Sequence, residues 1–405
     1  MHPVGHQRPV GGGLEMLIIQ PTPFCNIDCA YCYLPHRTSK ERMSEATLEQ
    51  LFRKVFASPI LANELTVLWH AGEPLVAGIG YYERAFRVID RLNRRPAKLN
   101  HTIQTNGILL TQQWIDFFRM HDVRIGVSLD GPARLHDRYR KTRNGRGTHA
   151  LVMRGIKLLQ QNELPFDVIT VLTRESLTSA RELFEFYVEH QIRHVAFNIE
   201  EVEGRHSRSS LEGPTIVNDV RAFFDELFRL NHQAGQPLDV REFAGALGVI
   251  LNGNGEGYDN PQAEPLRIVS VGVHGELSTF SPELLGYGAE PYGDFVFGNV
   301  HETPDLAAIL DDSRFIRVNS DIQRGIQKCR RDCEYFEVCL GGAPANKLFE
   351  NGSFDSTETM YCRLSKKAVI DVVLARLEEQ LGGRATAGAS ERTTSSRKED
   401  DIPIQ

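Results

Sequence analysis

The sequence has no cysteine outside two short groups. Its seven cysteines lie within residues 25–32 and 329–362. Cysteines without a common task would be scattered through a chain of 405 residues. In a reducing compartment, grouped cysteines are more often metal ligands than disulfide partners. Three cysteines in one group and four in the other suit two metal clusters. The first would keep one metal position without a protein ligand, and the second would have all its positions filled by cysteines.

The sequence also lacks the signals for a membrane span or for export. No run approaches the roughly 20 apolar residues that cross a bilayer. Residues 1–6 lack the apolar core of a signal peptide. Both absences predict a cytoplasmic protein with no membrane partner.

Positive charge is neither in excess nor concentrated. There are 46 Lys and Arg against 53 Asp and Glu, which gives a net charge of −7. Binding to duplex nucleic acid needs clustered positive charge. The composition therefore argues against a nucleic-acid partner, although it leaves a small RNA substrate open.

What the sequence does have is a regular alternation of apolar runs and segments with helical periodicity. The predicted strands are 15–20, 65–69, 99–105, 123–129, 166–172 and 194–199. The predicted helices between them are 45–57, 81–94, 111–120, 148–161 and 177–190. Such alternation predicts an α/β fold with a parallel sheet, in the form of a partial (β/α)6 TIM barrel. Active-site residues should then lie at the carboxyl ends of the strands.

The same pattern divides the chain into five parts. Residues 1–13 are rich in proline and glycine and are predicted to be flexible, and residues 14–200 form the barrel. Residues 201–265 break the alternation with two predicted helices, 216–231 and 239–251, which we expect to cover the barrel mouth. Residues 266–380 hold short β-like runs, the second cysteine group and a closing helix, 368–380. Residues 381–405 are rich in small and charged residues and are predicted to be disordered.

The first cysteine group has the pattern C-x3-C-x2-C, formed by Cys25, Cys29 and Cys32 directly after the first predicted strand. Three thiolates on so short a loop can hold three corners of a [4Fe–4S] cube. The fourth iron then has no protein ligand and is open for chemistry, like the open position of a catalytic zinc site. The alternative is a zinc ion with His36 as fourth ligand, but zinc sites commonly use C-x2-C pairs.

This pattern, with Tyr31 before and Tyr33 after the last cysteine, resembles the signature of the radical S-adenosylmethionine (SAM) superfamily. The resemblance implies that the amine and carboxylate of SAM chelate the open iron. One electron from the cluster then cleaves the sulfonium and yields a 5′-deoxyadenosyl radical. The resemblance also implies that Tyr31 and Tyr33 lie beside the cofactor.

The ends of three further strands carry motifs of the same superfamily. Residues 70–74 resemble its GGEP motif, in which Ala71, Gly72 and Glu73 would engage the methionine ammonium. Small residues there let the backbone approach a ligand closely. At the next two strand ends, Asn-Gly and Asp-Gly pairs are ordinary turns when taken singly. The resemblance nevertheless implies contacts to the ribose and carboxylate of SAM from Gln104, Asn106, Ser128 and Asp130.

Residues 136–148 also recur in members that mature peptides and sulfatases. An arginine here can clamp a carboxylate through two parallel hydrogen bonds. The sequence does not decide between Arg140, which we take as the cofactor-binding residue, and Arg143.

The second cysteine group resembles the SPASM, or twitch-like, iron–sulfur domain of peptide-modifying members. A full SPASM domain has seven cysteines and two auxiliary clusters. Here Phe280 and Thr303 stand where cysteines of the first auxiliary cluster are expected. One auxiliary [4Fe–4S] cluster is therefore predicted, and a structural zinc ion on the same thiolates is the alternative. Its ligands would be Cys329, Cys333, Cys339 and Cys362.

Finer motifs at residues 31–35, 279–286 and 341–348 are similar to those of cyclophane-forming maturases associated with glycine-rich-repeat precursor peptides. That resemblance implies a peptide substrate, from which the deoxyadenosyl radical takes a hydrogen atom at an unactivated Cβ. The carbon radical would add to an aromatic ring of the same peptide and form a three-residue cyclophane. The ring must then lose one electron and one proton, for which the auxiliary cluster and Glu283 are the predicted acceptors.

The resemblance implies two partners, the precursor peptide and a reducing electron donor of flavodoxin or ferredoxin type. Many peptide maturases carry an N-terminal winged-helix domain that grips the leader of the precursor. About fourteen residues precede the first predicted strand, too few for such a domain. Leader recognition is therefore expected at the barrel rim, in residues 200–265, or on a partner.

Two rival functions stand beside this one. An anaerobic sulfatase maturase converts Cys or Ser to formylglycine, but that family usually has three clusters, hence about twelve irons rather than about eight. A non-enzymatic zinc or iron–sulfur scaffold is the other rival. It would leave the polar residues at the strand ends unexplained.

Overall fold

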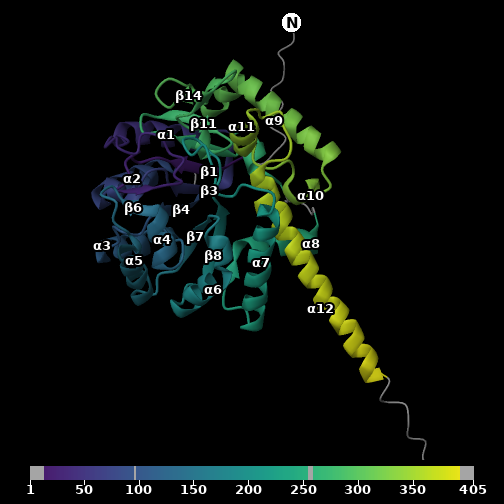
Figure 1. The fold of residues 1–405 in the computed structure, drawn as a ribbon. Coiled ribbons are helices and arrows are strands. Elements are labelled where there is room, and N and C mark those ends of the chain that lie inside the picture. Colours follow the sequence, from purple (N-terminus) through teal and green to yellow (C-terminus); the bar gives the residue numbers. More distant parts are fainter. Residues whose placement is uncertain (1–12, 95–96, 254–258, 393–405) are drawn as a thin grey trace, which may run out of the picture.

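The computed structural model describes residues 13–94, 97–253 and 259–392. Within them, a ten-stranded sheet runs through the molecule (Figure 1). Six of its strands are parallel neighbours in the order β1-β3-β4-β5-β7-β8, which confirms the predicted partial barrel. Their bounds are β1 Leu14–Ile19, β3 Leu61–Trp69, β4 Lys98–Thr105, β5 Arg124–Ser128, β7 Phe166–Leu172 and β8 His194–Ile199.

The helices between these strands are amphipathic and bury one side each. In α1, Leu48, Leu51 and Val55 recur at helical spacing and are buried. Ser44 caps this helix by accepting a hydrogen bond from the backbone N–H of Thr47 at 3.0 Å. The bounds are α1 Glu45–Ala57, α2 Ile79–Leu92, α3 Gln112–Met120, α4 Ala133–Tyr139, α5 His149–Gln161 and α6 Ala180–Glu189.

Two predicted boundaries in the barrel are wrong by more than two residues, and the others agree within two residues. Strand β3 begins at Leu61 instead of residue 65. The predicted helix 177–190 is broken at Ser179, which separates the 3-10 turn η2 (Ser176–Thr178) from α6. The side chain of Ser179 accepts a hydrogen bond from Arg134 at 2.7 Å, a tertiary contact that local periodicity does not reveal.

The segment after the barrel adds to one edge of the sheet. Its elements are α7 (Ile216–Gln233), β9 (Asp239–Val240), α8 (Arg241–Asn252) and η3 (Pro261–Ala263). β9 pairs with β8, α7 packs on α6, and α8 packs on β8. We expected both helices to cover the barrel mouth. Instead they flank the sheet edge, and only the loop that begins at Glu200 reaches the cavity at the strand ends.

The C-terminal region adds to the opposite edge of the same sheet. β10 (Ile268–Val271) pairs in parallel with β1, and β11 (Glu276–Thr279) and β14 (Gly298–Asn299) follow antiparallel. Because β1 lies between β3 and β10, backbone hydrogen bonds fix this region against the barrel. The remaining elements are η4 Pro282–Leu284, β12 Gly288–Ala289, β13 Gly293–Asp294, η5 Leu306–Asp311, α9 Ser313–Asp332, α10 Phe336–Cys339, α11 Pro344–Asn351, the π-helix η6 Cys362–Lys367 and α12 Ala368–Arg392.

Aromatic packing surrounds Phe280, the residue that replaces an expected cysteine. Phe280 is fully buried and stacks on Phe315 with the ring centroids 5.8 Å apart. Phe297 meets Phe315 edge to face at 5.7 Å. Thr303, at the second replaced position, accepts a hydrogen bond from the backbone N–H of Asn299 at 2.9 Å. Both positions are therefore occupied by ordinary packing and turn contacts.

The last helix is longer than predicted. α12 runs to Arg392 and extends away from the body of the molecule, in yellow in Figure 1. The described part of the predicted disordered tail is therefore helical, which agrees with the alanines at 385, 387 and 389. Residues 393–405 lie outside the described residues, as do residues 1–12 of the predicted flexible N-terminus. None of the helices in the described ranges is long and apolar enough to cross a membrane.

Candidate active site

The first cysteine group lies on the loop between β1 and α1, and a short strand pair anchors it. β2 (Ile27–Cys29) pairs antiparallel with β6 (Arg140–Thr142), and Cys29 stands opposite Arg140. The thiols of Cys25, Cys29 and Cys32 line one cavity of about 340 Å³. The chain thus brings the three predicted ligands together at the carboxyl end of the sheet.

The residues of this loop fit a [4Fe–4S] cluster. Burial raises the pKa of the Cys25 thiol to about 12 and that of Cys29 to about 11, and neighbouring acids and thiols add to the rise at Cys25. A cationic iron cluster would stabilise the thiolates that burial disfavours. Across the described residues, no three Cys, His, Asp or Glu side chains converge closely enough to hold a single ion. Thiolates on a cube bind different irons and stand further apart. His36, the candidate fourth zinc ligand, does not line the cavity.

Most of the predicted SAM-binding residues line the same cavity. Gln104 and Ser128 lie at the ends of neighbouring strands, and the Gln104 amide donates to the Ser128 hydroxyl at 3.0 Å. The Asn106 amide donates to Asn26 at 2.7 Å and lies 3.9 Å from the Cys25 sulfur. The predicted residues on the cavity wall are Tyr31, Tyr33, Gly72, Glu73, Gln104, Asn106, Ser128, Arg140 and Glu283.

The turn after β3 packs against the cysteine loop. Ala71 and Gly72 both have positive φ, 67° and 87°. A Cβ on Gly72 would lie 2.4 Å from the carbonyl oxygen of Thr22, so only glycine permits this approach. Ala71 is not on the cavity wall. Gly72 thus permits a close contact within the chain, and because it also lines the cavity, the close contact to a ligand stays a prediction.

Glu73 is buried, and its carboxylate accepts three hydrogen bonds. Its carboxylate accepts from the backbone N–H of Asn106 at 2.8 Å, from the Thr105 hydroxyl at 2.7 Å and from the backbone N–H of Leu75 at 3.0 Å. Burial raises the pKa of Glu73 to about 7, against these hydrogen bonds. Glu73 therefore ties the ends of β3 and β4 together at the cavity wall.

Arg140 faces the cavity, whereas Arg143 does not. The Arg140 guanidinium is buried, donates two hydrogen bonds to Asp130 at 2.9 and 3.1 Å, and lies 4.0 Å from the Cys29 sulfur. Arg143 is exposed and donates to the carbonyl of Cys25 at 2.9 Å. The geometry favours Arg140 of the two.

Asp130 is not on the cavity wall. It accepts hydrogen bonds from Arg140 and from the Tyr31 hydroxyl. Asp130 therefore orients two residues that do lie on the cavity wall. Burial alone would raise the pKa of Asp130, but the Arg140 guanidinium holds it below its ordinary value. Asp130 thus acts behind the cavity as an anchor.

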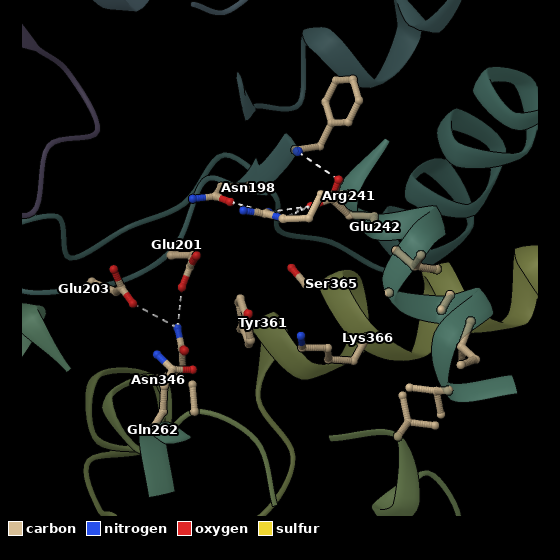
Figure 2. A pocket seen from close by; sticks show the side chains of 18 of the residues that line it. Asn198, Glu201, Glu203, Arg241, Glu242, Gln262, Asn346, Tyr361, Ser365 and Lys366 are labelled. Carbon is tan, nitrogen blue, oxygen red and sulfur yellow. Dashed lines mark hydrogen bonds and ion pairs between the residues drawn. The ribbon is translucent and has the colours of Figure 1, made fainter. Parts of the chain in front are cut away.

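A group of glutamates joins this cavity to a second one of about 520 Å³. Glu201 and Glu203 follow β8, and Glu283 lies in η4; all three line both cavities. Figure 2 shows Glu201 and Glu203 beside Asn346, whose amide donates to them at 2.7 and 3.2 Å. Burial raises the pKa of all three glutamates, that of Glu283 to about 8. Among the described residues, one Glu283 oxygen has no hydrogen-bond partner.

The far wall of the second cavity comes from α8, η6 and α12. Arg241 donates to Asn198 at 2.7 Å and to Glu242, and these three side chains lie together in Figure 2. Tyr361 and Lys366 face them from the C-terminal region. The second cavity is thus built from the flanking segment and the C-terminal region together.

The second cysteine group is assembled from separate elements. Cys329 lies near the end of α9, Cys339 ends α10, Cys362 begins η6, and Cys333 follows α9. All four line one cavity of about 270 Å³. Burial raises the pKa of Cys362 to about 12, so here too a cationic cluster would stabilise the thiolates. Four thiols around one cavity fit the predicted auxiliary cluster.

Several residues of these sites were not predicted. Glu201 and Glu203 follow a strand end, as the predicted Ser128 does, and the same rule would have found them. Asn346 and Lys347 have no such signal. Their positions depend on how α11 packs between the two cysteine groups.

Comparisons with known proteins agree with this arrangement. The model of the family described as the Radical SAM superfamily matches residues 19–187, which include the first cysteine group and the ends of β3, β4 and β5. An uncharacterised protein of Synechocystis sp. is 44% identical and covers 92% of this chain and 94% of its own length. A serine-type anaerobic sulfatase-maturating enzyme of Bacteroides thetaiotaomicron is 30% identical over 84% of each chain.

A solved structure is also similar across almost the whole chain. It is described as native anSMEcpe with bound AdoMet (SAM) and Cp18Cys peptide. The TM-score is 0.73 at 21% identity, and the match covers 91% of this chain and 99% of that one. The likeness shows that the two proteins share a fold.

Proposed function

This chain belongs to the radical SAM superfamily, and from that premise we propose that it crosslinks a ribosomally made peptide into a three-residue cyclophane. The family and its relatives make it a radical SAM enzyme of the SPASM maturase class, which modifies a protein or peptide. Membership implies a [4Fe–4S] cluster and SAM as cofactors. We assign this cluster to Cys25, Cys29 and Cys32.

The observation that supports a peptide substrate best is the pair of connected cavities. The cavity of about 340 Å³ contains the cysteine loop and the strand ends, and the one of about 520 Å³ continues from it past Glu201, Glu203 and Glu283. A peptide segment in the larger cavity could extend one side chain into the smaller one. The peptide-bound anSMEcpe structure shows that a relative of this fold accepts a peptide.

When bound, the cluster and SAM supply a 5′-deoxyadenosyl radical that takes one hydrogen atom from the substrate Cβ. The chain's own residues position the reactants. Gln104 and Ser128, already hydrogen-bonded to one another, face the cavity where the ribose and carboxylate of SAM would lie. Asp130 pairs with Arg140 and holds its guanidinium in one orientation on this wall.

Glu283 is our proposed base. Once the Cβ carbon has bonded to the aromatic ring, the ring must lose one proton and one electron to regain aromaticity. Burial raises the pKa of Glu283 to about 8, so its carboxylate form binds a proton more tightly than the carboxylate of an ordinary glutamate. One Glu283 oxygen is buried without a hydrogen-bond partner among the described residues, so its acceptor site is unused. The four cysteines of the second group hold the centre that we propose accepts the electron, and a flavodoxin- or ferredoxin-type donor supplies the electron that cleaves SAM.

Conversion of Ser or Cys to formylglycine is the second candidate. The 30% identity to a sulfatase-maturating enzyme over 84% of both chains favours it. This reaction also removes a hydrogen atom, a proton and an electron, so Glu283 could serve either substrate. Sulfatase maturases usually have a further cluster in the region of Phe280. Aromatic packing occupies this region here, which favours cyclophane formation over formylglycine formation.

The test is anaerobic reconstitution followed by mass spectrometry of two peptides. One is a short peptide rich in aromatic and glycine residues encoded beside the gene, and the other is a sulfatase-derived peptide with Ser or Cys at the target position. The proposal predicts about eight irons per chain, deoxyadenosine formation, and a crosslink in the first peptide. An aldehyde in the second peptide, with no crosslink in the first, would show that the enzyme forms formylglycine and would contradict the cyclophane proposal.

A further inference from the structure

Lys347 is a buried cation without a carboxylate partner. Its side chain lies on α11, is 4% exposed and belongs to the wall of the second cysteine cavity. The ammonium nitrogen lies 3.5 Å from the Cys329 sulfur. None of the ion pairs found among the described residues includes Lys347, whereas two other lysines of this region are paired. Lys367 lies 2.6 Å from Glu358, and Lys328 lies 2.9 Å from Asp355.

The ammonium group lies in a crowded part of the fold. Gly325 on α9 lies beside it, and a Cβ at that position would be 3.2 Å from the Lys347 nitrogen and 2.3 Å from the Phe354 carbonyl oxygen. A side chain at residue 325 would therefore crowd both. Burying an ammonium without a counter-charge is costly. A buried ammonium group without a carboxylate partner therefore implies that a negative charge belongs next to it.

The four thiolates of a filled centre provide that charge. A [4Fe–4S] core with two positive charges and four thiolates carries a net charge of two minus, and its one-electron reduction makes it three minus. A cation within a few ångströms stabilises the more negative, reduced state more than the oxidised state. Hydrogen bonds to sulfur and nearby charge are established means of tuning such centres.

We propose that Lys347 is the buried counter-ion of the second iron–sulfur centre and raises its reduction potential. This rests on the proposed function, which assigns an auxiliary cluster to the four cysteines. Lys347 is a positioning residue in this role, because it acts through the cluster and does not touch the substrate. A higher potential makes the centre a better acceptor for the one electron that the product ring releases.

The decisive measurement is the potential of the second centre alone. In a full-length Cys25→Ala, Cys29→Ala, Cys32→Ala background, redox titration followed by electron paramagnetic resonance reports only that centre. Adding Lys347→Met should lower the midpoint potential by at least about 59 mV, a tenfold shift of the oxidised-to-reduced ratio. Lys347→Arg, which keeps the charge, should stay near the parent. Lys367→Met is the matched control, since Glu358 already compensates its charge, and it should move the potential less than Lys347→Met.

Stability gives a second, independent measurement. Without iron, Lys347→Met removes an unpaired buried charge and should leave the urea midpoint unchanged or raise it. With iron bound, the same variant should lower the midpoint relative to the parent. A variant that loses stability equally with and without iron would show a purely structural role and overturn the proposal.

The remaining outcomes separate this inference from the function on which it rests. If the background protein binds about four irons and Lys347→Met titrates like the parent, the counter-ion role is wrong and the auxiliary cluster stands. If the background binds no iron, the auxiliary cluster fails, and the Lys347 proposal fails with it.

Discussion

The two cysteine groups differ in how the chain builds them. The first is a single loop of three thiols, and the ends of neighbouring strands supply the rest of its wall. The second takes four thiols from residues 329–362, and only tertiary packing brings Cys362 to the others. Three ligands leave one iron for a small molecule, and four leave none. In the proposed function, cysteine side chains therefore build two different sites. The first group leaves a position for a ligand, and the second group leaves none and exchanges only electrons.

The charges around the two groups differ as well. The first cavity opens toward Glu201, Glu203 and Glu283, and its buried arginine is neutralised by Asp130. At the second, the buried charge is Lys347, which has no carboxylate partner among the described residues and lies 3.5 Å from the Cys329 sulfur. A cluster that must give an electron away gains nothing from a neighbouring unpaired cation, whereas one that must accept an electron does. The surroundings thus match the roles proposed for the two groups.

The largest expected contrast is between Cys29→Ala and Cys333→Ala. Cys29→Ala should abolish deoxyadenosine formation, because one of three cluster ligands is lost. Cys333→Ala should retain deoxyadenosine formation and lose most of the crosslinked peptide. Chromatography of deoxyadenosine and mass spectrometry of the peptide on the same samples measure both. Equal loss of deoxyadenosine in the two variants would show that the groups do not have separate tasks.

Glu283→Gln should reduce crosslinking by about 10²–10⁴-fold, because an amide cannot take up the proton. In the parent enzyme, the crosslinking rate should rise with pH through about 8, where Glu283 becomes the free carboxylate, and level off above. The variant should lose this dependence. Glu290→Gln, an exposed residue of the same segment, is the control. A variant that keeps the parent's pH profile would mean that another group is the base.

Arg140→Met and Arg143→Met compare a buried arginine of the cavity wall with an exposed arginine at its rim, through the free energy of unfolding. Removing Arg140 leaves Asp130 buried without its partner and should cost about 3–5 kcal/mol of unfolding free energy. Arg143 is exposed, and its loss should cost less than about 1 kcal/mol. Urea unfolding of the iron-free proteins measures both values. Similar losses in the two variants would contradict the assignment of Arg140 as the buried anchor.

Asn346→Ala should cost about 1–3 kcal/mol of unfolding free energy, less than Arg140→Met, because Glu201 and Glu203 lose a shared hydrogen-bond donor. Asn346→Asp places a third carboxyl group against the pair. Its stability relative to Asn346→Ala should therefore fall as pH rises from about 5 to about 8, since the three groups then ionise together. Thermal unfolding across this range measures the difference, and a constant difference would argue against the contact.

The barrel could be predicted from the sequence because its signals are local. Each strand is a short apolar run, each helix has its own periodicity, and the first three cysteines are within eight residues of one another. The roles of Asp130 and Glu73 could not be predicted in the same way. The strand-end rule placed both near the cofactor, but it does not tell whether a side chain faces the cavity or holds a neighbour.

The C-terminal residues show the same limit more strongly. Phe280 was recognised as a missing cysteine, yet its stacking on Phe315 depends on the packing of α9 against β11 and its flanks. Lys347 belongs to the motif at residues 341–348, but a motif of this kind does not tell that the lysine side chain is buried. Burial of such a residue follows from contacts between elements far apart in the sequence, which periodicity does not contain.

Helix α11 has a consequence for protein engineering. Asn346 and Lys347 are consecutive, yet one contacts the glutamates of the substrate cavity and the other contacts Cys329. Consecutive residues of a helix point about 100° apart, so one rotational setting of α11, started by Pro344, serves both sites. A chimera that exchanges the C-terminal region with that of a relative must keep the number of residues before α11 unchanged, so that the rotation of the helix about its axis is preserved. A single insertion before α11 would turn the Asn346 amide away from Glu201 and Glu203 and the Lys347 ammonium away from Cys329 at once.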